Sequence, residues 1–195
     1  MGDVARAKPP ATLAELAALR DRGLAVELID GEIVHKAMPK PEHGSAQVKI
    51  GAVLDAFHRR PGGPRGPGGW WLMSEVEILY PQTEETFRHD LVGFRRERFP
   101  ERPTGMPLEA RPDWVCEILS PTTARYDVVK KQRTLHAHGI AHYWIVDPEH
   151  ETLMVLRHGP EGYVNVLNAG VGDIVRAEPF EAIDLDVGEL FGREP

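Results

Sequence analysis

The continuous apolar run from Ala141 to Val146 is the feature that most constrains the fold of this chain. It is bounded by Gly139 and Pro148, and a short run without polar alternation is typical of a strand buried on both faces. Another strand is predicted at 113–119, and residues 124–138 between the two carry a helical pattern that Gly139 closes. This part of the chain therefore predicts a mixed α/β sheet.

Local signals near the N-terminus predict two short elements. Thr12 followed by Glu15 is a capping box, so a helix is expected over 13–22. Asp30-Gly31 lies between two short apolar runs, which is a strong signal for a β-hairpin over 25–35.

The rest of the chain divides into one more helix, a loop and several strands. Apolar residues recur on one helix face over 46–57, and the Pro/Gly-rich segment 61–69 that follows is expected to be a loop. The order helix, strand, strand, strand, helix, strand indicates an α/β core, with a β-rich tail after it. The remaining expected strands are 70–80, 88–95, 152–158 and 162–167.

The composition excludes some classes of protein. Cys116 is the only cysteine, and its apolar neighbours indicate a small buried hydrophobe rather than a nucleophile. No apolar stretch approaches the roughly 20 residues that span a bilayer, so we expect a cytoplasmic protein with no membrane association. The net charge of −7 argues against a generic nucleic-acid coat, but not against an enzyme that holds DNA through a local basic patch.

Glu117 is the most informative residue of the chain. It lies in the run Val115-Cys116-Glu117-Ile118-Leu119, whose other members predict a buried strand. An ionised carboxylate buried there needs a cation, a hydrogen-bond network or a raised pKa. The alternative is a carboxylate that faces solvent at a sheet edge or pairs with a structural arginine.

Asp90 is the second candidate and is expected at the start of the strand 88–95. Adjacent strands place facing side chains about 5 Å apart, so Asp90 and Glu117 are expected to meet at one oxygen-rich site. Such a pair of carboxylates suits Mg²⁺ or Mn²⁺. These ions activate water and stabilise the charge that develops on phosphate.

Several short motifs lie between about residues 25 and 165. They are Glu27-Leu28-Ile29-Asp30-Gly31-Glu32, His43, Glu117-Ile118-Leu119-Ser120-Pro121, Asp127 with Lys131, and Tyr143-Trp144-Ile145-Val146-Asp147-Pro148. Together they resemble the Uma-two (Uma2) family of restriction-endonuclease-like proteins.

The resemblance implies a single domain over 1–195 with a PD-(D/E)XK nuclease core at about 40–150, preceded by a helix and hairpin. In this restriction-endonuclease-like fold, Asp90 corresponds to the metal-binding aspartate of the second core strand and Glu117 to the acid of the third. A divalent metal ion and a DNA substrate are implied with them. The expected activity is metal-dependent endonuclease hydrolysis of DNA phosphodiester bonds.

The sequence departs from the motif at one position. A lysine normally follows two residues after the second acid, where it acts on the attacking water and the transition state, and this chain has Leu119 there. Lys131 is the candidate substitute, reaching back from the following helix. Alternatively, Lys131 forms a salt bridge with Asp127, four residues earlier on the same helix face.

Several further residues are candidates for supporting roles. Glu32 joins the metal site or is an exposed strand acid, and His43, expected just before the helix over 46–57, touches phosphate, orients a carboxylate or caps the helix. Glu75 and Glu77 are expected on one solvated strand face. The predicted DNA contacts are Arg125, Lys130 and Arg133, with Arg59, Arg60 and Arg65 as a second basic group that is more simply explained by solubility.

Two other functions compete with the nuclease. A catalytically inactive nuclease-like fold that binds DNA or a protein is favoured by Leu119 and by the acidic net charge. An accessory protein that acts on RNA is the third alternative. Enzymes that cut both strands often work as symmetric dimers, so a homodimer is the expected assembly.

Overall fold

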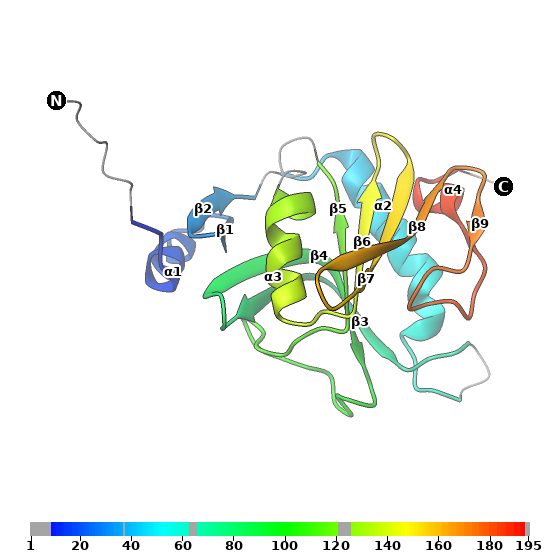
Figure 1. The fold of residues 1–195 in the computed structure, drawn as a ribbon, viewed down its shortest axis with the longest axis horizontal. Helices are drawn as coiled ribbons and strands as arrows, with labels where there is room; N and C mark the ends of the chain where they lie inside the picture. The colour runs from blue at the N-terminus through cyan, green and yellow to red at the C-terminus, as the bar shows by residue number, and fades with distance from the viewer. Residues whose placement is uncertain (1–8, 37, 63–65, 121–125, 194–195) are drawn as a thin grey trace.

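A computed structural model describes residues 9–36, 38–62, 66–120 and 126–193. Its centre is an eight-stranded sheet in the order β2-β1-β4-β5-β6-β7-β8, with β3 paired to β4 (Figure 1). Only β5 and β6 run parallel among the described pairs of this sheet. The strands are β1 Val26–Ile29, β2 Glu32–His35, β3 Trp70–Tyr80, β4 Glu85–Arg95, β5 Trp114–Ile118, β6 His142–Asp147, β7 Thr152–His158 and β8 Tyr163–Gly170.

Helices cover both faces of this sheet. The long helix α2, Pro41–Val53, continues into a short 3₁₀ turn, η1 Leu54–Phe57, and packs beside α4, Val187–Leu190. The opposite face carries a π-helical turn, η2 Tyr126–Lys131, that continues into α3, Gln132–Ala137 (Figure 1). The remaining elements are α1 Leu13–Asp21, β9 Ile174–Val175 and β10 Leu185–Asp186.

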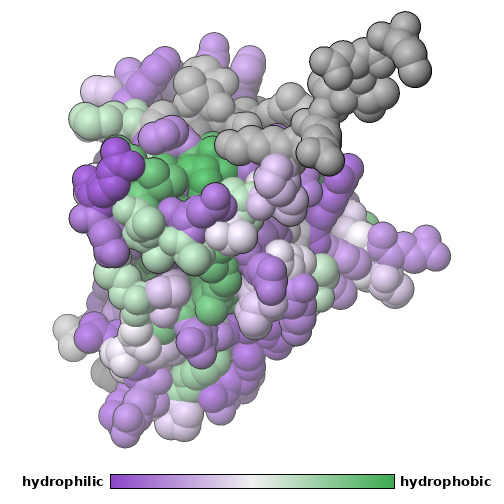
Figure 2. All heavy atoms as spheres, turned by 90° about the vertical axis from the view of Figure 1, so that its left-hand side faces the viewer, coloured by the Kyte–Doolittle hydropathy of each residue, from purple (hydrophilic) through white to green (hydrophobic). Residues whose placement is uncertain are grey.

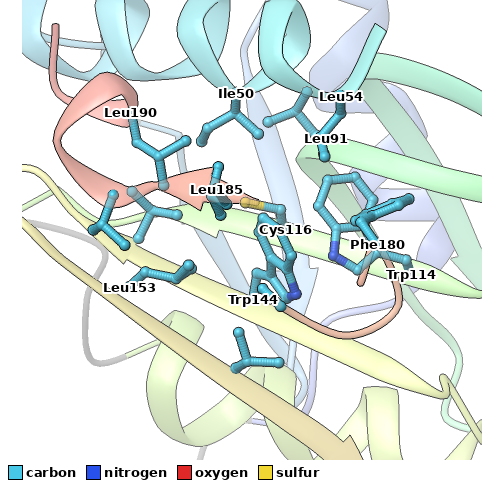
Figure 3. Close-up of a cluster of buried hydrophobic side chains, with 14 of the residues drawn as sticks. Ile50, Leu54, Leu91, Trp114, Cys116, Trp144, Leu153, Phe180, Leu185 and Leu190 are labelled. Atoms are coloured by element: carbon cyan, nitrogen blue, oxygen red, sulfur yellow. The ribbon is translucent and has the colours of Figure 1, made fainter. Parts of the chain in front are cut away.

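Each face of the sheet has its own apolar core. On one face, Ile50 of α2 and Leu190 of α4 pack over Trp114, Cys116 and their neighbours (Figure 3). On the other face, Leu135 of α3 packs with buried residues that include Val115, Phe87 and Tyr143. Residues of β5 therefore alternate between the two cores, and Glu117 falls on the α3 face.

The alternation of β3 and β4 changes phase at one position. The α3-side core takes Trp71 and Met73 from the first part of β3, and then Val76, Ile78 and Tyr80. The paired strand β4 makes the same change. Val92 and Phe94 lie in that core and so does Phe87, although Phe87 lies five positions before Val92 and a regular strand would place them on opposite faces. Glu75 and Asp90 lie at the break, and Glu75 has a φ of 53°.

The second edge of β4 is shared by two strands. Leu28 of β1 pairs with Thr86, whereas β5 pairs with residues 91–93, and β3 occupies the other edge throughout. Residues 87–90 of this edge thus lie between β1 and β5. Side chains bond the backbone here: Arg88 N donates to Glu27 Oε1 (2.6 Å), and Arg88 O accepts from Lys36 Nζ (3.1 Å). The break in the ladder leaves room for a polar site within the sheet.

The predicted α/β fold and its strands are confirmed, with two corrections at element boundaries. The capping box at Thr12 and Glu15 and the hairpin at Asp30-Gly31 are both present. The long helix begins at Pro41, so His43 lies in its first turn rather than before it. Strand β4 begins at Glu85, so Asp90 lies in the middle of the strand and not at its start.

The end of the sheet that carries α1 and the β1–β2 hairpin has a mainly hydrophilic surface. Figure 2 shows this face, on which hydrophobic residues gather in a strip between hydrophilic ones. No helix of the described ranges is long and apolar enough to cross a membrane.

Candidate active site

The gap in the sheet opens into a pocket of about 220 Å³. It is lined by both predicted acids, Asp90 and Glu117, and by Lys131. A second pocket of about 390 Å³ shares His43 and Ser120 with the first. Ser120, which both pockets share, lies just beyond the carboxyl end of β5.

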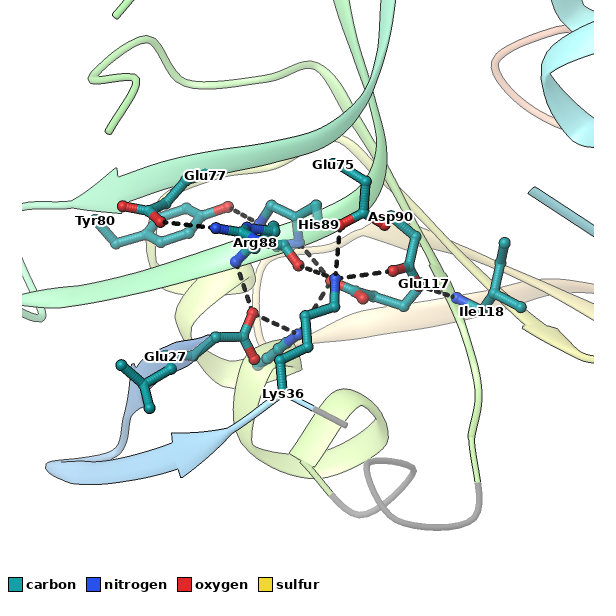
Figure 4. A network of polar contacts seen from close by, with 12 residues as sticks. Glu27, Lys36, Glu75, Glu77, Tyr80, Arg88, His89, Asp90, Glu117 and Ile118 are labelled. Atoms are coloured by element: carbon teal, nitrogen blue, oxygen red, sulfur yellow. Dashed lines mark hydrogen bonds and ion pairs between the residues drawn. The ribbon is translucent and has the colours of Figure 1, made fainter. Parts of the chain in front are cut away.

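Asp90 is 2% exposed, and both of its oxygens have partners (Figure 4). Oδ2 accepts from the backbone N–H of Ile118 (2.8 Å) and contacts His43 Nε2 (3.2 Å), while Oδ1 lies 3.1 Å from Lys36 Nζ. Burial opposes ionisation of Asp90, but the His43 hydrogen bond and the Lys36 charge outweigh it and lower the pKa. Asp90 is therefore an anion, bonded to the residue that follows Glu117.

Glu117 is also 2% exposed, as predicted from its apolar neighbours. Its Oε1 contacts His89 Nδ1 and lies 3.4 Å from Lys131 Nζ. The other ring nitrogen of His89, Nε2, is 2.6 Å from the hydroxyl of Tyr80. A buried chain of polar groups thus runs from Tyr80 through His89 to Glu117 (Figure 4).

The protonation state of His89 follows from its surroundings. Burial, and then the charges of Lys131 and Lys36, hold the pKa of His89 well below its usual value, so the ring is neutral. A neutral ring has one N–H, and a carboxylate only accepts, so Nδ1–H donates to Glu117 and Nε2 accepts from Tyr80. This arrangement fixes the orientation of the Glu117 carboxylate.

The two neighbouring lysines of η2 have different environments. Lys131 is 3% exposed and lies between Glu27 Oε1 (3.5 Å) and Glu117 Oε1 (3.4 Å), on the side of the pocket where the prediction placed it. Lys130 Nζ instead pairs with the hairpin, at 2.8 Å from Glu32 Oε2 and 3.4 Å from Asp30 Oδ2. Only Lys131 of these two reaches the acids of the pocket.

Glu32 does not join the candidate metal site. Its side chain is 59% exposed, pairs with Lys130 and is not part of the pocket wall, because β2 is the edge strand of the sheet. His43 does reach the candidate metal site, because its Nε2 contacts Asp90 Oδ2. Arg125 and the side chain of Asp127 lie outside the described part of the chain, and so does Arg65. Arg133 is exposed.

Three pocket residues were missed by the sequence analysis or given other roles there. Glu27 bonds Arg88 N and Lys131; its signals in the sequence are its place in the first family motif and its position inside the apolar run 25–29. Lys36 Nζ contacts Asp90 Oδ1 and also lies 3.4 Å from Glu75 Oε2. Glu75 lines the pocket while its side chain stays 44% exposed, as expected. Glu77 was also expected in solvent, but it is 6% exposed and paired with Arg20. The phase change in β3 separates the two glutamates.

The donors of the pocket fit a hard cation that keeps part of its water. No group of three or more Asp, Glu, His or Cys side chains in the described ranges forms a metal-ligand cluster. Mg²⁺ commonly binds one or two carboxylates and retains several waters, which matches Asp90 and Glu117. Two ammonium groups already lie against these carboxylates, and the pKa of Asp90 is lowered, so the site favours positive charge.

Comparison with known proteins identifies the family of the chain. The model of the Uma2 family, described as "Putative restriction endonuclease", matches residues 11–188. This chain belongs to the Uma2 family. The Uma2 match includes every pocket residue named above. No curated protein matches the chain.

A solved structure shares the fold of this Uma2 protein. It is described as "a putative nuclease belonging to DUF820" from Anabaena variabilis, and the two chains are 24% identical. The superposition has a TM-score of 0.71 and covers 93% of this chain and 98% of the other. The similarity extends over nearly the whole of both chains and shows a nuclease-like fold.

Proposed function

We propose that this protein is a metal-dependent endonuclease that hydrolyses DNA phosphodiester bonds. The observation that supports it best is the pairing of two buried acids, Asp90 and Glu117, in one pocket with cationic groups against both. Buried acids carry a large desolvation cost, and a protein retains them most often where they bind a cation or act in catalysis. The Uma2 family match agrees with a nuclease.

Each pocket residue has a role in this proposal. Asp90 and Glu117 would hold Mg²⁺ or Mn²⁺, which supplies, when bound, an activated water and neutralisation of charge on the phosphate. Two hydrogen bonds orient Asp90, from Ile118 N and His43, and the His89 contact orients Glu117.

Lys131 would perform the work of the lysine that is absent at Leu119. Its ammonium is held between Glu27 and Glu117, so η2 fixes it at the pocket although the strand itself carries no lysine at position 119. From there it would donate to the attacking water or to a phosphate oxygen as negative charge develops. A lysine on the adjacent helix is geometrically equivalent to one on the strand, provided its ammonium reaches the same carboxylate.

The test is cleavage of supercoiled plasmid DNA with Mg²⁺, with Mn²⁺ and with a chelator. We expect cleavage with the metal ions only, abolished by Asp90→Asn and by Glu117→Gln in variants that remain folded. Lys131→Met should lower turnover by about two orders of magnitude or more, whereas Lys130→Met should change it little. Equal, small effects of the two lysine substitutions would contradict the role of Lys131.

The same assay separates the alternatives. Binding of DNA without cleavage under all metal conditions would favour the catalytically inactive binding module. Cleavage of single-stranded or structured RNA, but not of plasmid DNA, would assign the chain to RNA. Gel filtration of the same samples tests the homodimer expected for an enzyme that cuts both strands.

A further inference from the structure

The ammonium of Lys36 uses all three of its donors on oxygen atoms of the pocket. Its partners are Asp90 Oδ1 (3.1 Å), the carbonyl oxygen of Arg88 (3.1 Å) and Glu75 Oε2 (3.4 Å) (Figure 4). Carboxylate and carbonyl oxygens are also the ligands that hard divalent ions prefer. The lysine thus sits in surroundings that suit a metal ion.

The two oxygens of Asp90 are held in different ways. Oδ2 is fixed by Ile118 N and His43, which belong to the folded framework of β5 and α2. Oδ1 contacts Lys36, whose long side chain is 20% exposed and follows the end of β2. Oδ1 is therefore the oxygen that can change its partner without unfolding a strand or helix.

We infer that Lys36 is a resident cation of the pocket, and that a divalent metal ion binds Asp90 only by displacing the Lys36 ammonium from Oδ1. This inference rests on the proposed metal site at Asp90 and Glu117. Lys36 then keeps the acids compatible with folding when metal is absent, and it sets the metal concentration at which the pocket fills.

Charge determines the direction of the effect. A divalent ion at Oδ1 would lie within a few ångströms of the ammonium, and two cations at that distance repel strongly in a partly buried site. Lys36 must leave Asp90, Glu75 and the Arg88 carbonyl together, and the loss of these contacts weakens metal binding. Replacing Lys36 by a neutral side chain removes both the repulsion and the competing contacts.

The experiment is calorimetric titration of the whole protein with Mn²⁺ alone, without DNA. Lys36→Met should tighten the dissociation constant for Mn²⁺ by about tenfold or more, equivalent to about 1.4 kcal/mol. The matched control is Lys130→Met, which also removes an ion-paired lysine but one outside the pocket. The control should stay within about twofold of the wild type, because its carboxylate partners are not metal ligands.

The outcomes separate this inference from the proposed function. Tighter binding in Lys36→Met alone supports both, including the case in which the wild type binds too weakly to measure. Binding by the wild type that Lys36→Met leaves equal or weaker overturns the inference and keeps the metal site. Failure of every variant to bind Mn²⁺ or Mg²⁺ overturns both.

A second measurement needs no variant and so does not depend on the folding of Lys36→Met. Amine-reactive labelling of the wild-type protein, read by mass spectrometry, reports how accessible each lysine is. Addition of Mn²⁺ should increase labelling of Lys36 several-fold and leave Lys130 unchanged. Unchanged or reduced labelling of Lys36 at saturating metal would overturn the displacement.

Discussion

A buried chain of three side chains determines how Glu117 is presented to the pocket. The Tyr80 hydroxyl donates to His89 Nε2, and His89 Nδ1 donates to Glu117 Oε1. Tyr80 and His89 are fully enclosed, and burial together with the nearby Glu117 charge raises the pKa of Tyr80 well above its usual value. The tyrosine thus stays a donor, and both hydrogen bonds of this network are donated toward Glu117.

Removal of the first donor should weaken this arrangement without removing an acid. Tyr80→Phe should cost about 1 kcal/mol of stability and lower plasmid cleavage by about tenfold or more, as for other lost supports of metal ligands. The control is Tyr163→Phe, which loses a 2.7 Å hydrogen bond to Ile140 O at a distance from the pocket. A similar loss of activity in both variants would show that the effect is general destabilisation.

Sequence reasoning found the residues whose chemistry conflicts with their neighbours. Glu117 stood out because it interrupts a buried apolar strand, and it is buried as predicted. Glu27 interrupts the apolar run 25–29 in the same way and is 4% exposed, but the run was interpreted only as one strand of a hairpin. Lys36 gave no such signal, because a charged residue beside a hairpin is ordinary until the tertiary fold turns it inward. The contacts of Lys36 join residues separated by more than 50 positions, which periodicity does not predict.

At the scale of whole elements, the phase change shared by β3 and β4 determines which of their side chains face the pocket. A regular pair of strands would keep Glu75 and Glu77 on one face, as the sequence analysis expected. The left-handed φ of Glu75 shifts the alternation, so that Glu77 is buried against Arg20 while Glu75 turns to Lys36. Backbone strain of this kind is concentrated at functional sites, where surrounding contacts hold it in place.

A pair of substitutions measures the backbone strain at Glu75 separately from its charge. Both Glu75→Gly and Glu75→Ala remove the carboxylate, but only glycine adopts a φ of 53° without a Cβ clash. The glycine variant should therefore be more stable than the alanine variant by about 0.5–1 kcal/mol, after the larger entropy of unfolded glycine is subtracted. Denaturant unfolding at neutral pH gives the difference. An alanine variant of equal or greater stability would show that the strand relaxes to a regular conformation.

Element positions were predictable where the apolar period was strong. The strand over 70–80 and the hairpin turn at Asp30-Gly31 agree with the observed bounds. The first turn of α2 was not predicted, because Pro41 starts a helix without a side-chain cap, and the apolar face begins only at Ala46. Val128 belongs to the predicted helix over 124–138 but is 37% exposed, since η2 is wound as a π-turn and not as an α-helix.

At the scale of the whole molecule, stability should fall on the acid side from near neutrality. Burial and the charge of Arg96 lower the pKa of His58, and burial also lowers that of His142. His58 Nδ1 accepts from Leu72 N (2.8 Å), which requires an unprotonated nitrogen. The unfolded chain takes up protons near pH 6.5 that the folded chain does not, so stability is lost as pH falls below that value.

His58→Gln should flatten this dependence. The glutamine amide has an oxygen to accept from Leu72 N but does not titrate, so unfolding midpoints at about pH 7.5 and about pH 5 should differ less than in the wild type. His142 and acidic groups supply the dependence that remains. A variant with an unchanged pH profile would show that His58 is protonated to the same extent in both states.

The charge distribution of the whole molecule leads to an expectation for DNA binding. The chain has a net charge of −7, so phosphate contacts depend on the few cations that carboxylates do not already neutralise. Lys130 is paired with Glu32 and Asp30, whereas Arg133 is exposed on the next turn and has no ion pair in the described ranges. Of these two predicted contacts, Arg133 is therefore the one expected to neutralise phosphate.

The salt dependence of binding distinguishes the two residues. Each phosphate contact contributes a slope of about 0.9 to the plot of log binding constant against log salt concentration. Arg133→Ala should reduce that slope by close to one. Lys130→Ala should leave the slope nearly unchanged and lower affinity only because Glu32 and Asp30, no longer neutralised, repel phosphate. Fluorescence anisotropy with a short DNA duplex and Ca²⁺ in place of Mg²⁺ measures both. An equal loss of slope would mean that Lys130 leaves the hairpin to contact phosphate, because only a lysine that exchanges Glu32 for DNA releases the same number of counterions as a free arginine.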